Sequence, residues 1–248
     1  MRKIPKTLVA IIIICIVFLT SCSNHQNYDF YATSEDGNRL FYKIVGGEVH
    51  VVPELPEFSK TNFTYFNNPP VGSLIIPEIV THDGFTYVVT EIEENTFVGC
   101  KFYGFILPIT MKKIGPFAFA NCQNITGINI PNSVTEIGYD AFDYCSGLKS
   151  IHFGESLEII GNSVFQGCKE IEKIVVNDNN KVFDSRENCN GVIRTCDNTL
   201  IIACKNTDIP SSVENIGEYA FYNGLPDRIP ERVNNLPIIK TTVLEGWR

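Results

Sequence analysis

The chain lacks the motifs that most often carry chemistry. It has no nucleophile elbow, no phosphate-binding P-loop, no dinucleotide fingerprint and no zinc-binding helix. Its 20 Lys and Arg residues are outnumbered by 28 Asp and Glu residues, and no basic run or basic-aromatic stripe stands out. Nucleic-acid binding depends on clustered positive charge, so we expect no nucleic-acid partner. We also expect no catalytic residue, no cofactor and no metal ion.

Long hydrophobic runs are scarce too, and the clearest one lies at the N-terminus. Leu8 to Leu19 is apolar and follows three basic residues. A membrane-spanning helix needs about 20 apolar residues, so residues 1–21 are predicted to be a signal peptide. The tetrad Leu19-Thr20-Ser21-Cys22 resembles a bacterial lipobox, which implies cleavage before Cys22 and lipid attachment to that residue. An ordinary secretion signal followed by an incidental cysteine is the alternative.

One phrase recurs through the middle of the chain. Its short apolar parts are Val89–Ile92, Met111–Ile114, Val134–Ile137 and Leu157–Ile160. Each is followed by a phenylalanine and then a cysteine, in the pairs Phe97/Cys100, Phe119/Cys122, Phe142/Cys145 and Phe165/Cys168. The four cysteines are 22, 23 and 23 residues apart. Such a period predicts a solenoid, in which each unit buries its apolar side against the next.

A second apolar phrase follows each cysteine and predicts one strand per coil. It is clearest in Ile125-x-x-Ile128-x-Ile130. Side chains alternate along a strand, so Ile128 and Ile130 should point inward and Asn129 outward. The candidate ligand-binding residues are the outward positions of successive coils, Ile106, Asn129, His152 and Val175. An ordinary solvated sheet face is the alternative interpretation of this row.

The expected fold class is a β-rich (α+β) leucine-rich repeat solenoid. It has a parallel sheet of stacked short strands, short helical turns on the opposite side and an N-terminal β-hairpin cap. The helical turns are predicted at the Phe-x-x-Cys segments, whose Phe119, Phe142 and Phe165 should stack into an internal aromatic column. Two histidines of the cap region, His50 and His82, are predicted to be solvated, as is His25 in the tether.

Nine cysteines raise the question of disulfides or metal binding. Cys15 leaves with the signal peptide and Cys22 would carry lipid, and the remaining odd number cannot pair completely. Equivalent cysteines should stack about 4.8 Å apart with parallel side chains, whereas the Cβ atoms of a disulfide converge to about 3.8 Å. A ladder of free thiols is therefore favoured over disulfides. No C-x-x-C pair or matching histidine spacing indicates zinc.

The period divides the chain into segments. They are residues 1–21 (signal peptide), 22–27 (tether), 28–88 (N-terminal β cap and first coil), 89–176 (regular repeats), 177–208 (an enlarged coil with a projecting hairpin insert), 209–236 (last repeats) and 237–248 (C-terminal tail).

The full phrase resembles a known family. Ile-Pro-x-x-Val-x-x-Ile-Gly-x-x-Ala-Phe-x-x-Cys, clearest from Ile130 to Cys145, is similar to the BspA-type leucine-rich repeats of bacterial surface proteins. The insert from Phe183 to Asn190 and the N-terminal cap are similar as well, so the resemblance covers about residues 28–236. The strand phrase lacks the x-x-Asn-x-Leu ending of standard leucine-rich repeats, so the eukaryotic classes are poor guides. The resemblance implies adhesion to host or matrix proteins or to other cells.

The expected protein is thus a lipid-anchored component of a bacterial cell envelope. It would be an outer-membrane lipoprotein, attached through its N-terminal lipid alone, that recognises a host matrix or cell-surface protein. A glycan-binding or nutrient-capture component beside an outer-membrane transporter is the alternative. The aromatic candidates for glycan binding are Tyr139, Tyr144, Tyr219 and Tyr222. Whether the chain faces outward or into the periplasm is left open.

Overall fold

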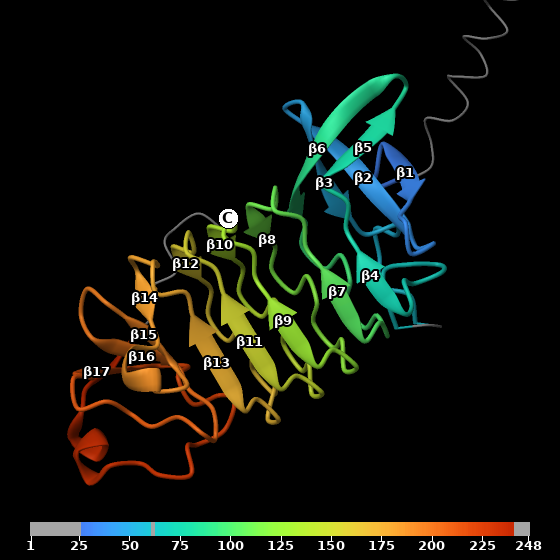
Figure 1. The fold of residues 1–248 in the computed structure, drawn as a ribbon. Coiled ribbons are helices and arrows are strands. Elements are labelled where there is room, and N and C mark those ends of the chain that lie inside the picture. The colour runs from blue at the N-terminus through green and yellow to red at the C-terminus, as the bar shows by residue number, and fades with distance from the viewer. Residues whose placement is uncertain (1–25, 61–62, 241–248) are drawn as a thin grey trace, which may run out of the picture.

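The computed structural model describes residues 26–60 and 63–240. The predicted signal peptide (residues 1–21), the predicted lipid-attachment residue Cys22 and His25 lie outside the described residues. Within them the chain is a row of stacked coils with antiparallel strands at the N-terminal end (Figure 1). The helices that the structure describes are two short 3-10 helices, η1 (Arg186–Asn188) and η2 (Glu231–Asn235). No helix in this part of the chain is long and apolar enough to cross a membrane.

The N-terminal end is a meander of three antiparallel strands. They are β1 (Phe30–Thr33), β2 (Arg39–Val45) and β3 (Glu48–Val52). The β1–β2 turn is tied to the first coil, because the backbone N–H of Ile75 donates to Asp36 and the Asn38 side chain bonds the backbone of Val71. The meander therefore docks on the solenoid through polar contacts as well as apolar packing.

A second hairpin leads into the repeats. It consists of β5 (Ile79–His82) and β6 (Phe85–Ile92), which pair antiparallel. Its two turn residues, Asp83 and Gly84, have φ angles of 50° and 80°, as the tight hairpin turn requires. β6 then pairs in parallel with β3, so one continuous sheet joins the N-terminal strands to the coils.

The regular coils carry two rows of strands. The longer strands follow the apolar phrase after each cysteine and are β4 (Ser73–Ile75), β7 (Gly104–Ile106), β9 (Gly127–Asn129), β11 (Ser150–Phe153) and β13 (Lys173–Val176). These five lie side by side (Figure 1). The shorter strands, β8 (Lys113–Ile114), β10 (Glu136–Ile137) and β12 (Ile159–Ile160), extend the parallel sheet begun by β3 and β6. The sequence pattern predicts only the row of longer strands.

The Phe-x-x-Cys segments are hydrogen-bonded turns, and the helical turns expected there are not confirmed. The Phe119 N–H donates to the Ala141 carbonyl of the next coil at 2.8 Å, which is a bond between coils and not within a helix. Phe117 and Asp140, at equivalent positions, have φ angles of 52° and 53°. One left-handed residue at each coil interrupts any helical run.

The expected aromatic column is confirmed. It contains Phe66, Phe97, Phe119, Phe142 and Phe165, each with at most 2% of its surface exposed. Successive ring centroids are 5.9, 5.3, 5.1 and 5.4 Å apart and the rings are stacked. Stacked rings at this spacing bury large apolar area and gain a favourable ring contact. The column is therefore the centre of the core.

The thiols form the expected ladder beside this column. Cys122 Sγ donates to the Phe97 carbonyl at 3.0 Å, and the Sγ atoms of Cys145 and Cys168 donate to the matching carbonyls one coil earlier at 3.1 Å. All seven described cysteines are free thiols. Burial raises the pKa of Cys122 and Cys145 well above the ordinary thiol value. The thiols of Cys122 and Cys145 thus remain protonated, and the three hydrogen bonds link each coil to the preceding one.

The insert forms a hairpin but does not project, so that expectation is wrong. Its sheet consists of β14 (Phe183–Asp184), β15 (Val192–Arg194), β16 (Thr199–Ile202), β17 (Asn215–Gly217) and β18 (Ile238–Ile239). All four residues of β16 are buried, as are Val192 and Ile193. The hairpin is apolar on both faces, so it packs between two sets of coils and not into solvent.

The insert also closes the end of the parallel sheet. β13 is the last strand of its sheet. Its Ile174 N–H donates to Asn190 Oδ1 at 2.8 Å, and its Val176 N–H donates to Ser185 Oγ at 3.1 Å. Side chains therefore satisfy donors that an exposed sheet edge would offer to another strand.

Candidate ligand-binding groove

The four residues predicted to form a ligand-binding row lie on the outer face of the longer strands. His152 on β11 is directly opposite Asn129 on β9 and Val175 on β13. Asn129 and His152 are exposed, Ile106 has 58% of its surface exposed, and Val175 is half-buried. The flanking residues Ile128, Ile130, Ile151 and Phe153 are all buried. The predicted alternation is therefore confirmed.

Three of these residues line an open hollow of about 710 Å³. They are Ile106, Asn129 and His152, whereas Val175 is outside its lining. A second rim comes from the loops that follow the strands, and it includes Ile109, Asn132, Glu155 and Asn177. This volume is in the range of ligand sites, about 300–1,000 Å³. We name this hollow, with its two rims, the groove.

The second rim was missed by sequence reasoning, although a signal for it exists. Ile109 and Asn132 each follow a proline that ends a strand phrase, and Glu155 occupies the same position one coil later. If the repeat period is applied to the loop after each strand as well, it predicts one loop side chain per coil beside the outward row of strand residues. The loop positions of a solenoid repeat as regularly as its strand positions do.

Most polar side chains of the groove make no described hydrogen bond within the protein. The structure describes no hydrogen bond or ion pair from the side chains of Asn129 and His152 within residues 26–60 and 63–240. On the second rim, Asn132 Oδ1 accepts the Glu155 N–H at 3.2 Å, which fixes the loop. Ser133 Oγ is buried and has no described partner. An amide and an imidazole can each donate and accept, so the row can pair with a peptide backbone or with hydroxyl groups.

The groove is apolar at one end and polar at the other. Ile106 and Ile109 are strongly exposed, at 58% and 73%. Asn129, His152 and Glu155 form the polar half, and Glu155 is its only acidic side chain. Exposed apolar side chains next to hydrogen-bonding groups suit a partner that is itself amphipathic. A strongly anionic partner would meet no lysine or arginine in the lining.

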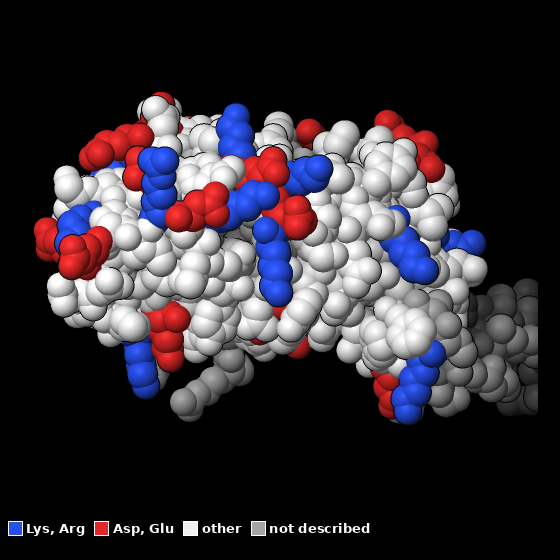
Figure 2. Space-filling view, turned by 90° about the horizontal axis from the view of Figure 1, so that it is seen from below, with Lys and Arg blue, Asp and Glu red and all other residues white. Residues whose placement is uncertain are grey.

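Charge elsewhere on the described surface is mixed. Figure 2 shows acidic and basic side chains close to one another on one face, with wide uncharged areas around them. Several form ion pairs, including Lys205 with Glu172 at 3.2 Å and Arg194 with Asp197 at 2.6 Å. The face in Figure 2 thus carries no continuous basic stripe of the kind that binds a phosphate backbone.

A second polar cluster lies on the sheet formed by β3 and β6. His50 is buried, with 8% of its surface exposed, so the expectation that it is solvated is wrong. Its Nδ1 is 2.6 Å from Glu93 Oε1 and 3.6 Å from Glu91 Oε2. Burial lowers the pKa of His50, but the hydrogen bond to Glu93 and the nearby carboxylates together raise it above its ordinary value. His82 is half-buried and stacks on Phe30 at 4.2 Å.

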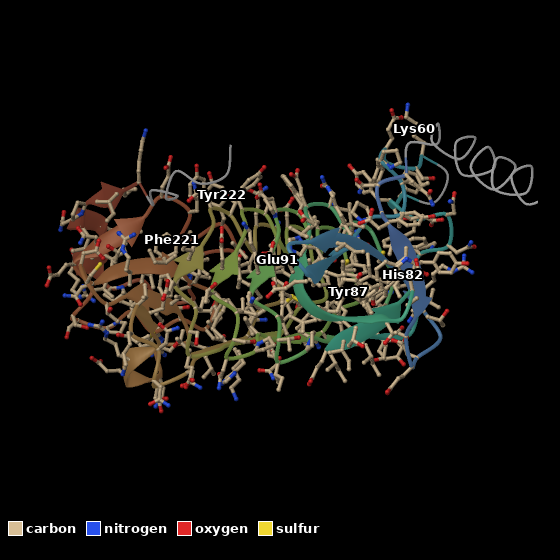
Figure 3. All side chains as sticks on the ribbon, turned by 90° about the horizontal axis from the view of Figure 1, so that it is seen from above. Lys60, His82, Tyr87, Glu91, Phe221 and Tyr222 are labelled. Atoms are coloured by element: carbon tan, nitrogen blue, oxygen red, sulfur yellow. The ribbon has the colours of Figure 1, made fainter. Side chains whose placement is uncertain are left out.

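The tyrosines proposed for glycan contact are not part of the groove lining. Tyr144 and Tyr222 have 51% and 47% of their surface exposed, and Tyr139 packs against Phe117. Tyr219 and Tyr222 form an edge-to-face pair at 4.9 Å. Figure 3 shows Tyr222 and Phe221 in the C-terminal half, away from Glu91 and Tyr87. These rings do not form one continuous platform.

Solved bacterial structures are similar to this chain. A leucine-rich repeat protein from Eubacterium ventriosum is 17% identical with a TM-score of 0.52, covering 84% of this chain and 61% of its own. A leucine-rich repeat protein from Bacteroides capillosus is 22% identical with a TM-score of 0.46, covering 56% and 94%. A leucine rich cell surface protein from Faecalibacterium prausnitzii is 17% identical with a TM-score of 0.36, covering 79% and 68%. The first similarity shows a shared fold.

The repeats themselves identify the family. The family model of the BspA type leucine rich repeat region matches six copies over residues 90–224, which is more than half of the chain. No curated protein matches the chain. The matched copies include the column from Phe97 to Phe165 and the thiol ladder, so the residues that define the repeat motif are also residues of the core. The chain belongs to the BspA-type leucine-rich repeat family.

Proposed function

We propose that this protein is a lipid-anchored, adhesin-like recognition component of a bacterial cell envelope that binds a segment of a host matrix or cell-surface protein in the groove. The observation that carries the proposal is the alignment of Ile106, Asn129 and His152 over one open hollow. Membership in a family of bacterial surface repeats supports the same class of function. The proposed role is binding and not catalysis.

The physical basis is the rigidity of the groove. Its outward side chains stand on hydrogen-bonded strands whose inward neighbours are packed in the core. A preorganised surface loses little conformational entropy on binding, so contacts to a partner are converted efficiently into affinity. An extended peptide with apolar residues at one end and hydrogen-bonding or basic residues at the other would match the groove. Glu155 would favour the basic end.

The proposed anchor is the lipid on Cys22. That residue precedes the described part of the chain, and the motif Leu19-Thr20-Ser21-Cys22 alone supports the assignment. Metabolic labelling with a palmitate analogue tests it, because Cys22→Ala should abolish incorporation. Protease treatment of intact cells then separates an outward-facing protein from a periplasmic one, and protection from the protease would contradict adhesion.

Glycan binding is the second candidate function. A separate hollow of about 400 Å³ is lined by Phe58 and Phe63, which have 41% and 67% of their surface exposed. Asn121, Gln123 and Asn124 line the same hollow. Exposed rings beside amide groups are suited to the apolar faces and hydroxyl groups of sugars. This hollow, more than the tyrosines, supports the glycan proposal.

A matched pair of double variants tests the groove. Asn129→Glu with His152→Glu places two negative charges in it, and Thr126→Glu with Ser146→Glu places two on exposed positions of the same coils outside its lining. Binding of each protein to a panel of matrix proteins and to a glycan array is measured together with the melting temperature. We expect loss of matrix-protein binding only in the groove variant, at unchanged melting temperature. Equal binding by both variants would exclude the groove, and binding to glycans alone would favour the second candidate.

A further inference from the structure

Three side chains with metal-ligand chemistry meet where β3 joins β6. His50 is opposite Glu91 in the parallel pairing. Glu93 follows the last residue of β6 and, two residues after Glu91, lies on the same side. One ligand atom from each of the three lies within 4.8 Å of the others. Tetrahedral ligand atoms around Zn²⁺, with bonds of about 2.0–2.1 Å, are about 3.3 Å apart. The observed Nδ1 to oxygen distances of 2.6 and 3.6 Å bracket that value.

The backbone holds the three ligands in place. The β3–β6 pairing shifts register between Val49 and His50, and such a bulge redirects the side chain beside it. The Glu93 N–H donates to the Val51 carbonyl at 2.9 Å, so Glu93 is bound to the strand that carries His50. Ligands on paired strands are positioned more precisely than ligands on loops.

The surroundings leave the carboxylates accessible. The side chains of Glu91 and Glu93 have 29% and 42% of their surface exposed, against 10% for His50. The cluster therefore opens to solvent on its carboxylate side, and Figure 3 shows Glu91 at the junction of the N-terminal strands with the coils. Two neighbouring lysines have carboxylate partners of their own, Lys112 with Glu48 at 2.6 Å and Lys113 with Glu136 at 3.5 Å.

We propose that His50, Glu91 and Glu93 bind a divalent transition-metal ion, with Zn²⁺ as the best fit. One imidazole nitrogen with two carboxylate oxygens suits zinc, whereas Ca²⁺ and Mg²⁺ prefer oxygen ligands throughout. Three protein ligands leave a fourth position for water or for a group from a binding partner. The sequence gives no metal motif here, because His50 is far from Glu91 along the chain and the set exists only through the β3–β6 pairing.

A bound ion would join two parts of the fold. His50 belongs to the N-terminal meander, and both glutamates lie in or directly after β6, which enters the first regular coil. An ion that binds the folded state alone stabilises it by mass action. Zn²⁺ would therefore fasten the meander to the solenoid, in addition to the parallel strand pairing already present.

Calorimetric titration of the full chain with Zn²⁺, in detergent and after removal of metal by a chelator, tests the proposal. We expect one equivalent to bind and the melting temperature to rise. His50→Gln, Glu91→Gln and Glu93→Gln should each weaken binding by at least about 100-fold, since even outer groups around a metal contribute 10–100-fold. The matched control is Glu136→Gln, a carboxylate on the same sheet, which should change the affinity by less than about 3-fold.

Cobalt substitution provides a readout independent of stability. Co²⁺ in a site with one nitrogen and two oxygen ligands should give visible absorption bands that disappear in Glu91→Gln, a variant that keeps the size of the side chain. The proposal is overturned if the full chain binds no Zn²⁺. It is also overturned if His50→Gln and Glu91→Gln, both folded by circular dichroism, bind Zn²⁺ as tightly as the unchanged chain, because other residues would then hold the ion.

Discussion

The regular coils and the C-terminal coils are built on the same phrase but packed differently. Phe142 and Cys145 of a regular coil are completely buried, with 0% exposed. Their C-terminal counterparts are Phe221, which is only half-buried, and Gly224, which has no side chain to enter the ladder. The larger core extends from Phe30 to Cys204, whereas the C-terminal coils depend on a separate small cluster around Leu200. A repeated phrase gives equal stability only where both neighbouring coils are present to cover it.

The largest expected difference concerns the aromatic column. Phe142→Ala removes a ring packed between Phe119 and Phe165 and should lower the free energy of unfolding by about 3–5 kcal/mol. Phe221→Ala should lower it by about 1–2 kcal/mol, because that ring already contacts solvent. Urea unfolding of the two variants measures the difference. Equal losses would contradict the idea that the two sets of coils are packed differently.

The next largest loss of stability is expected at Asn180, which connects the regular coils to the insert; we call this connection the joint. Asn180 is buried, its Nδ2 donates to the Gly154 and Leu157 carbonyls at 3.0 Å, and its Oδ1 accepts the N–H groups of Val182 and Phe183. Asn180→Ala leaves four backbone groups, three of them buried, without this partner and should cost about 2–4 kcal/mol in unfolding free energy.

The matched control for the joint is Asn177→Ala. Asn177 accepts one exposed N–H, from Asn179, and its loss should cost less than about 0.5 kcal/mol. Both variants are compared by chemical denaturation. If Asn180→Ala unfolds like the control, the joint is held by the apolar packing of the insert alone.

The thiol ladder should contribute less than the ring column. Cys145→Ala removes a buried sulfur and its hydrogen bond to the Phe119 carbonyl, and we expect a loss of about 1–2 kcal/mol. Cys196→Ala is the control, because Cys196 is exposed and should change the unfolding free energy by less than about 0.5 kcal/mol. Urea midpoints distinguish the two. A neutral Cys145→Ala would mean that the ladder fills space without linking the coils.

The smallest predicted effect is the stability gained when Asp143, a residue of the regular coils, is replaced by an uncharged residue. Burial and the charge of Asp140 raise the pKa of Asp143 from 3.8 to about 6, and one of its oxygens is buried without a described partner. The folded state therefore favours the protonated form, so stability falls as the pH rises from about 4 to about 6. The equivalent residues of the adjacent coils are Ala120 and Gln166, which carry no charge.

Asp143→Asn should accordingly raise the unfolding free energy by about 1 kcal/mol at pH 7, a value reduced for partial exposure to solvent. The gain should vanish below about pH 4, where Asp143 is protonated in the folded and unfolded states alike. Melting temperatures between pH 3.5 and 7.5 measure this dependence. A constant difference between the two proteins at every pH would show that charge is not its cause.

The sequence was sufficient to predict the surroundings of a residue where these depend only on its place in the strand or in the repeat. The alternation of Ile128, Asn129 and Ile130 follows from strand geometry, and the phenylalanine column follows from the period. Prediction from the sequence failed where the outcome depends on pairing between distant segments. Nothing local to His50 indicates that β3 will pair with β6, so its burial beside Glu91 could not be foreseen.

The turns and the insert illustrate two further limits. A left-handed conformation at Phe117 is unusual for a bulky residue, so the sequence favoured a helical turn instead. The insert has the strand-turn-strand pattern of a hairpin, but its strands carry apolar residues on both faces, and only the neighbouring coils decide that both faces are buried. The second rim of the groove, in contrast, was predictable from the period and was overlooked.

The closed edge at β13 sets a length limit on recognition. The groove runs from β7 to the loop after β13, so it crosses four of the longer strands; at about 4.8 Å per strand this is roughly 14 Å, which an extended peptide rising about 3.3 Å per residue crosses with about four residues. Side chains of Ser185 and Asn190 already accept the outward N–H groups of β13. A strand from a partner therefore cannot pair with β13 and extend the sheet. On the proposed function, a short peptide segment gives modest affinity for each molecule, so the proposed adhesion would depend on many copies acting together on one cell surface.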